Sequence, residues 1–206
     1  MAGDRARGFR RTGEIGMLRA LGLTLTILTP LALPCPVTAA PWTLDPATSV
    51  VASIGWEGKP IAVRFPGLSG EVDFDQAHLE TAKATLSVPA GRATTGNPIV
   101  DTMMRGGDYL DAGGHPTITF DLDRLTKTSK DTADITGTVT LRGVTRPVHL
   151  KAKVITFGPT RDDPSLMKAD FAISGEIDRR DFGSTAGIPD VSAIMPLDIR
   201  LVMTTR

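Results

Sequence analysis

The sequence predicts an all-β protein, an antiparallel β-barrel of about eight strands with one short helical segment near one end. Apolar and polar residues alternate with period two in most segments after residue 40, as expected for strands with one buried face. Gly, Pro, Asp and Ser gather between these segments, as in the turns of antiparallel sheets. Only residues 97–111 show helical spacing instead.

The strands follow from the alternation, in chain order. Two β-rich but less regular segments, 49–56 and 61–65, come first. The regular strands are 68–75, 82–88, 117–122, 134–141, 148–154, 170–177 and 197–204. Short strands separated by turn residues favour a sandwich or a barrel, and closure into a barrel removes exposed sheet edges.

Two connections have recognisable local chemistry. A turn is expected at 142–147, where Gly143 permits unusual backbone angles and Pro147 lies outside the ladder. Ile99, Val100, Met103 and Met104 have helical spacing, and Gly106 follows them. Residues 97–111 are therefore expected to form a short helix, a glycine break and one further turn, placed as a lid over the barrel mouth or packed against the barrel end.

The N-terminal segment is typical of a secretory signal peptide. Arginines up to Arg19 precede an uncharged, mostly apolar run over 20–33, and small residues follow up to Ala39. That run is shorter than the roughly 20 residues that span a bilayer, and prolines interrupt it. We expect residues 1–39 to be a signal peptide, residues 40–206 to form the barrel domain, and the mature protein to be periplasmic without stable membrane insertion. An uncleaved membrane anchor is the alternative.

Composition excludes several classes of protein. Lys and Arg number 23 and Asp and Glu also 23, so no net positive charge attracts nucleic acid. Aromatic residues make up 5% of the chain, too few for an extended base-stacking platform. The single cysteine, Cys35, is expected to leave with the signal peptide, so no disulfide framework or cysteine metal site is expected.

The inward positions raise the question of whether the interior is full. They include small residues among the large ones, which favours an internal cavity wide enough for one slender ligand. Alternatively, the small residues fit the taper of the barrel or permit sharp coiling of its strands. The small inward residues are Gly70, Ala82, Ala84, Gly137, Ala152 and Gly175.

Four blocks of sequence carry a resemblance to a known family. The blocks are 42–49 (WTLDPATS), 67–75 (GLSGEVDFD), 104–120 (MRGGDYLD, then HPTITF), and 135–150 (ITGTVTLRGVTRPVHL) followed by 178–183 (DRRDFG). In order and spacing they resemble the YceI family of secreted, lipocalin-like proteins. The resemblance implies a lipocalin-like barrel that holds a polyisoprenoid or an isoprenoid quinone.

The leading functional hypothesis is therefore a binding protein, not an enzyme, that sequesters or carries a long apolar lipid and needs no cofactor. A homodimer is compatible with this hypothesis. One alternative is an enzyme acting on a lipid or quinone, which requires convergent polar groups inside the barrel. The other is a stress-related interaction protein with a filled core, which requires that no cavity exceed a few water volumes.

The candidate site residues follow from this hypothesis. We expect no catalytic residue and no metal site, because His78, His115 and His149 lack metal-ligand spacing. Arg105 is expected either to pair with Asp108 or the 179–181 turn, or to bind a ligand head group. The residues expected to contact the apolar ligand are Trp56, Phe65, Met103, Met104, Tyr109, Leu110, Ile118, Phe120, Phe171 and Phe182.

Overall fold

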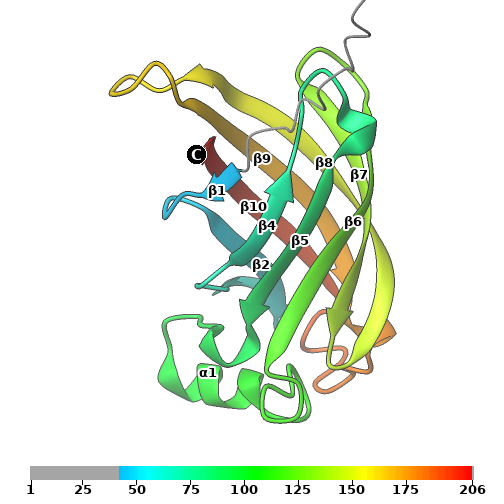
Figure 1. The fold of residues 1–206 in the computed structure, drawn as a ribbon. Coiled ribbons are helices and arrows are strands. Elements are labelled where there is room, and N and C mark those ends of the chain that lie inside the picture. Colours follow the sequence, from blue (N-terminus) through cyan, green and yellow to red (C-terminus); the bar gives the residue numbers. More distant parts are fainter. Residues whose placement is uncertain (1–41, 206) are drawn as a thin grey trace, which may run out of the picture. The chain divides into compact units, whose positions relative to one another are not determined.

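The computed structural model describes residues 42–205, which form a closed antiparallel β-barrel with one short α-helix (Figure 1). Eight strands make the ring, in the order β1-β4-β5-β6-β7-β8-β9-β10 and back to β1. The all-β class and the barrel predicted from the alternation are thus confirmed. The ring strands are β1 (Trp42–Leu44), β4 (Ser69–Asp73), β5 (Lys83–Pro89), β6 (Thr117–Lys127), β7 (Thr132–Leu141), β8 (Val144–Pro159), β9 (Met167–Asp178) and β10 (Ile194–Thr205).

Strand β1 closes the ring although it is only three residues long. Trp42 and Leu44 lie opposite Thr205 and Met203 of β10, and Trp42 also lies opposite Val72 of β4. The indole N–H of Trp42 donates to the carbonyl oxygen of Phe74 at 2.8 Å. Because Trp42 is buried, this contact ties β1 to the end of β4 beside the apolar interior.

The hairpin of β2 (Ser49–Trp56) and β3 (Lys59–Arg64) continues the wall beside β1. Residues 49–52 of β2 pair with residues 197–200 of β10, so β1 and β2 share one edge of that strand. At the bend between them, the Thr48 hydroxyl donates to the carbonyl oxygen of Val202 and accepts from its N–H. Residues 42–56 therefore form two short strands, β1 and β2, along the same edge of β10. The alternation in the sequence is irregular here because the chain bends between them.

The connection between β7 and β8 is tighter than the sequence indicates. Leu141 lies opposite Val144, so the loop consists of Arg142 and Gly143 alone, both with positive φ. Two positive φ values match the twist of a two-residue hairpin. The expected turn over 142–147 was therefore too long, and Pro147 lies within β8 opposite Thr138.

Helix α1 (Pro98–Arg105) confirms the predicted helical segment. The Asn97 side chain caps it by accepting from the N–H groups of Ile99 and Val100, and proline occupies the first turn, where it removes no helical hydrogen bond. The helix ends before Gly106, and residues 107–110 form the further turn. Three short 3₁₀ segments complete the fold: η1 (Leu79–Thr81), η2 (Ala90–Arg92) and η3 (Arg179–Phe182).

Two β-bulges change which residues face the interior. The register shifts between Leu122 and Arg124 on β6, and between Val154 and Thr156 on β8. Each bulge inserts one residue. Before the bulge the even-numbered residues face the interior, and beyond it the odd-numbered residues do. Leu125 and Phe157 thereby face inward, and both strands run past their predicted ends.

Gly70 is a position where the fold requires glycine. Its φ is +140°, and a Cβ built there would lie 2.0 Å from the carbonyl oxygen of Thr85 on the adjacent strand. Gly58 also has a positive φ, +77°, but a Cβ there would meet nothing within 4 Å. Comparing substitutions at the two glycines therefore distinguishes the cost of a positive φ from the cost of a steric clash with the neighbouring strand.

We expect Gly58→Ala to lower the free energy of unfolding by about 1–2 kcal/mol, the cost of an L-residue at positive φ. Gly70→Ala is expected to cost about 1–3 kcal/mol more, because the added methyl group forces strands β4 and β5 apart. Urea unfolding followed by circular dichroism measures both. Equal losses in the two variants would contradict the close-approach argument.

Candidate ligand cavity

A cavity of about 270 Å³ lies inside the barrel. Its wall is formed by successive inward positions, such as Leu197, Ile199 and Leu201 on β10, and by their counterparts on the other strands. About 10–15 Å³ of such volume holds one water, so the cavity is equivalent to roughly twenty waters. This is well above a few water volumes, so the filled-core alternative does not describe this barrel.

One end of the cavity is closed by a buried apolar cluster, and we call it the helix end because α1 lies there (Figure 1). Leu110 lines the cavity and packs in the same cluster as Phe65 and Phe182, all three at least 92% removed from solvent. Arg142 donates to the carbonyl oxygens of Gly107 and Tyr109, tying the chain after α1 to the β7–β8 turn. The helix end is thus sealed by packed side chains.

The opposite end of the cavity reaches loop residues that are exposed to solvent. We call it the open end, formed by residues 73–83 between β4 and β5 and residues 127–132 between β6 and β7. Charged or amide side chains line the cavity only here, among the residues that the structure describes. The cavity therefore has an apolar interior and one polar rim.

An aromatic cluster stands in the barrel wall close to the open end. Phe74, Phe157 and Phe171 all line the cavity, and Phe74 meets the other two edge-on at centroid distances of 6.1 and 5.7 Å. Trp42 lies 5.8 Å from Phe74 and 6.1 Å from Phe157. Such tilted and edge-on pairs stabilise packing beyond simple area burial, so this part of the wall is a rigid apolar surface.

The small inward residues contribute to the cavity unequally. Ala82, Ala84 and Ala152 line it, as their inward parity predicts. Gly137 and Gly175 do not, because the ring of Phe120 and the side chain of Leu150 occupy the space where a Cβ would stand, at 2.6 Å and 2.4 Å. The small alanine side chains therefore leave part of the interior unfilled, whereas the space beside the two glycines is filled by side chains of neighbouring strands.

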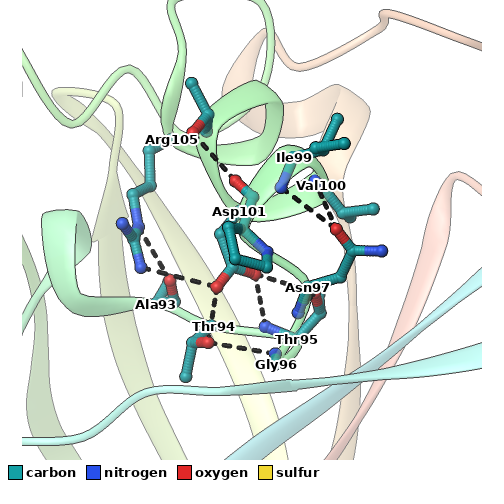
Figure 2. A network of polar contacts seen from close by, with 11 residues as sticks. Ala93, Thr94, Thr95, Gly96, Asn97, Ile99, Val100, Asp101 and Arg105 are labelled. Atoms are coloured by element: carbon teal, nitrogen blue, oxygen red, sulfur yellow. Dashed lines mark hydrogen bonds and ion pairs between the residues drawn. The ribbon is translucent and has the colours of Figure 1, made fainter.

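Asp101 anchors helix α1 to the loop before it (Figure 2). Its carboxylate is 6% exposed and accepts hydrogen bonds from the Thr94 hydroxyl at 2.6 Å and from the N–H and hydroxyl of Thr95 at 2.6 and 2.7 Å. The Thr94 and Thr95 hydrogen bonds hold the pKa of Asp101 below its usual value. Thr94 also exchanges backbone hydrogen bonds with Arg64, so the network connects α1 to β3.

Arg105 belongs to this network (Figure 2). Its Nε donates to the carbonyl oxygen of Ala93 at 2.9 Å, and its Nη2 lies 3.7 Å from the Asp101 carboxylate. The expected pairing with Asp108 or with the 179–181 turn was wrong. Asp101 is one turn earlier on the same helix face, whereas Asp108 lies beyond the helix end at Gly106.

A buried arginine organises the loop after η3. Arg179 is 2% exposed, and its guanidinium donates to four backbone carbonyl oxygens, those of Ser184, Ala186, Val191 and Ser192, at 2.7–3.0 Å. Its Cζ also lies 5.8 Å from the centre of the Tyr109 ring. The carbonyl groups satisfy the buried charge in place of a carboxylate and hold residues 184–192 in one conformation.

Comparison with known proteins decides the family. The YceI-like domain model matches residues 42–203, which is nearly all of the described chain. This protein belongs to the YceI family. A UPF0312 protein of Pseudomonas paraeruginosa is 35% identical over 120 residues, which are 58% of this chain and 61% of that protein's length.

Two solved structures share the YceI-family barrel. The crystal structure of BcnA from Burkholderia cenocepacia is 21% identical, with a TM-score of 0.70 over 78% of this chain and 99% of that one. A polyisoprenoid binding domain from Saccharophagus degradans is 18% identical, with a TM-score of 0.59 over 81% and 99% of the two chains. At these identities the likeness concerns the fold.

The YceI-family barrel brings together five of the predicted ligand-contact residues. Phe65, Leu110, Ile118, Phe120 and Phe171 all line the cavity. Ile118 and Phe120 come from β6 and Phe171 from β9, where strand parity turns them inward, whereas Phe65 and Leu110 come from the segments after β3 and α1.

The other predicted residues lie outside the cavity lining. Met104 and Phe182 pack in the apolar cluster of the helix end, and Tyr109 faces Arg179. Trp56 and Met103 are 37% and 43% exposed on the surface. Arg105, the predicted head-group residue, is likewise absent from the lining and is engaged with Ala93 and Asp101.

Several lining residues were missed by the sequence reading. Phe74 stands at the inward parity of its strand, so the alternation alone could have identified it. Leu125 and Phe157 follow the two bulges and therefore break the alternation in the sequence. No short-range signal marks a bulge here, which explains the omission.

The described residues contain no group of three or more His, Cys, Asp or Glu side chains placed to hold a metal ion. His78 pairs with Asp75 at 3.1 Å on an exposed loop, and this hydrogen bond raises the pKa of His78. Within residues 42–205, no helix is long and apolar enough to cross a bilayer. The cavity walls of this YceI-family protein are apolar, and the charged side chains lie outside the cavity or at its open end.

We expect Asp101→Asn to destabilise the protein at neutral pH, because it removes the charge that strengthens three hydrogen bonds. A carboxyl with a lowered folded-state pKa stabilises the fold above its unfolded value, about 4, and this contribution is lost as pH falls through the folded-state pKa. Urea midpoints of the wild type and the variant should therefore converge below about pH 4. The exposed Asp108→Asn is the control, and a gap that persists in acid would contradict this role.

Proposed function

We propose that this YceI-family barrel is a non-enzymatic binding protein that sequesters or carries a long apolar lipid, a polyisoprenoid or an isoprenoid quinone, within its cavity. The observation that carries the proposal is the apolar lining that continues from the helix end to the rim of the open end. A cavity slightly below the roughly 300–1,000 Å³ of typical ligand pockets suits a slender chain better than a broad ring system.

The energetics of chain burial support this proposal. Each buried CH₂ contributes about 0.8 kcal/mol, so a tail of about 15 carbons gives on the order of 10 kcal/mol before the entropic costs of association. A solved structure of the same fold, from Saccharophagus degradans, is described as a polyisoprenoid binding domain, which supports a chain-like ligand here. An enzyme would need convergent polar groups inside, and the described inward positions of this barrel are apolar.

We further propose that the protein is exported to the periplasm by residues 1–39, which lie outside the described residues. The motivating pattern is the arginine-rich start, the apolar run and the small residues up to Ala39. An extracytoplasmic site agrees with a mature chain that contains no cysteine and needs no reducing environment.

We expect affinity for isoprenoid alcohols to rise by at least about tenfold per added isoprene unit until the chain outgrows the cavity. Isothermal titration of the purified, delipidated protein with geraniol, farnesol and geranylgeraniol measures this. An affinity independent of chain length would contradict burial of the chain inside the barrel.

A matched pair of variants locates this binding. Ala152→Phe is expected to weaken farnesol binding by at least about tenfold, because the ring fills the cavity. Ala172→Phe, on the outward face of the neighbouring strand, is expected to leave the affinity unchanged. Equal losses in the two variants would place the ligand outside the barrel.

Export has its own test. We expect residues 1–39 fused to a reporter whose activity requires disulfide formation to give activity in a Gram-negative host. Replacing the apolar run over 20–33 with a polar sequence should abolish that activity while the fusion is still synthesised. An active fusion without the apolar run would contradict the proposed signal peptide.

A further inference from the structure

Leu110 is the point at which the loops of the helix end reach the cavity. Three connections close this end: residues 90–116 between β5 and β6, the turn at 142–143, and residues 179–193 between β9 and β10 (Figure 1). All three lie within the described chain, and Leu110 is the one residue that they contribute to the cavity lining. The Leu110 side chain is therefore the floor of the cavity, opposite the open end.

The other lining residues near the helix end belong to the barrel wall. They include Val88 on β5, Leu141 on β7 and Met195 on β10. Phe65 follows β3, and its N–H donates to the carbonyl oxygen of Val50 on β2 at 2.9 Å, so it extends the same wall. Wall side chains set the width of the cavity, whereas a side chain on the floor sets its length.

The backbone on both sides of the Leu110 side chain is held in place. The Leu110 N–H donates to the carbonyl oxygen of Met104 at 2.9 Å. The carbonyl oxygen of Tyr109 accepts from the Arg142 guanidinium at 3.0 Å, and the Tyr109 ring lies 5.8 Å from Cζ of the buried Arg179. These contacts give the floor a defined position, so the cavity has a defined depth.

A second apolar layer packs with Leu110 without reaching the cavity. Ala93 and Phe182 are buried in the same cluster as Leu110, and Met104 packs against that cluster. None of these three residues lines the cavity. A shorter side chain at position 110 would therefore extend the cavity toward apolar atoms, and a larger one would shorten it.

We propose that Leu110 limits the length of the apolar chain that this barrel accepts. This inference rests on the proposed function, because it takes the chain to lie in the cavity. Ile118 and Lys127, near the two ends of β6, both line the cavity. A strand rises about 3.3 Å per residue and is tilted by roughly 40° in a barrel, so about 20 Å of barrel axis separate the floor from the rim.

The limit acts through the burial of successive carbon atoms. Each CH₂ group that enters the cavity raises the affinity by up to about fourfold. Once the chain meets Leu110, a further carbon either stays in water and adds nothing or forces packed side chains to move, which is unfavourable. The affinity therefore rises with chain length and then reaches a plateau, and the chain length at the plateau reports the depth of the cavity.

The test measures affinity against chain length by equilibrium dialysis of delipidated protein with tritiated straight-chain alcohols of about 8 to 20 carbons, whose burial changes by one CH₂ at a time. Each affinity is divided by that of the same variant for the shortest alcohol, which cancels a general loss of affinity. Wild-type protein is expected to gain up to about fourfold per carbon until the plateau.

Substitutions at Leu110 should move the plateau in opposite directions. Leu110→Ala is expected to move it by about three carbons, the number that the side chain loses, so an alcohol of that added length binds at least about tenfold more tightly than to wild type. Leu110→Val gives a smaller shift in the same direction and a milder loss of packing. Leu110→Phe should move the plateau to shorter alcohols. Met104→Ala, which removes volume from the same cluster outside the lining, is the matched control and should leave the plateau unchanged.

The outcomes separate this inference from the proposed function. A plateau at the same chain length in wild type and the Leu110 variants would overturn the role of Leu110 while leaving chain binding intact. A shift in Met104→Ala as large as that in Leu110→Ala would also overturn it, as would an affinity that rises without a plateau. Failure of every alcohol to bind would instead refute the proposed function.

Discussion

Closure of the sheet by β1 is the constraint on which the cavity depends. Three residues of β1 pair with β10 on one side, and Trp42 pairs with β4 on the other. Once the ring is closed, each strand must send alternate side chains into a shared interior. In this chain those side chains include alanines on β5 and β8, so the closed ring encloses more volume than they fill.

The two ends of the barrel are built by different means. At the helix end, buried polar contacts organise the loops: Asp101 connects α1 to β3 through Thr94, and Arg179 holds residues 184–192 by their carbonyl groups. Apolar side chains then fill the space beneath. At the open end, the lining passes directly to charged residues of two loops. The cavity is therefore closed by packed side chains at the helix end and bordered by charged side chains at the open end.

The sequence predicted the parts of this structure that depend on local pattern. Period two identified every ring strand except the three-residue β1, and it placed Phe120 and Phe171 on the cavity wall. It failed where the backbone departs from regularity, because the bulges of β6 and β8 transfer Lys127 and Phe157 to the inward face without a sequence signal. The partner of Arg105 was missed since helix α1 ends at Gly106, before Asp108.

The middle of this barrel is vacant, apolar and continuous. Diffraction from xenon-pressurised crystals of delipidated protein tests it most directly, because dry apolar cavities bind xenon. We expect xenon between the inward side chains of β6, β9 and β10, near Phe120, Ile173 and Leu201. An interior filled by repacked side chains, with no xenon bound, would contradict it.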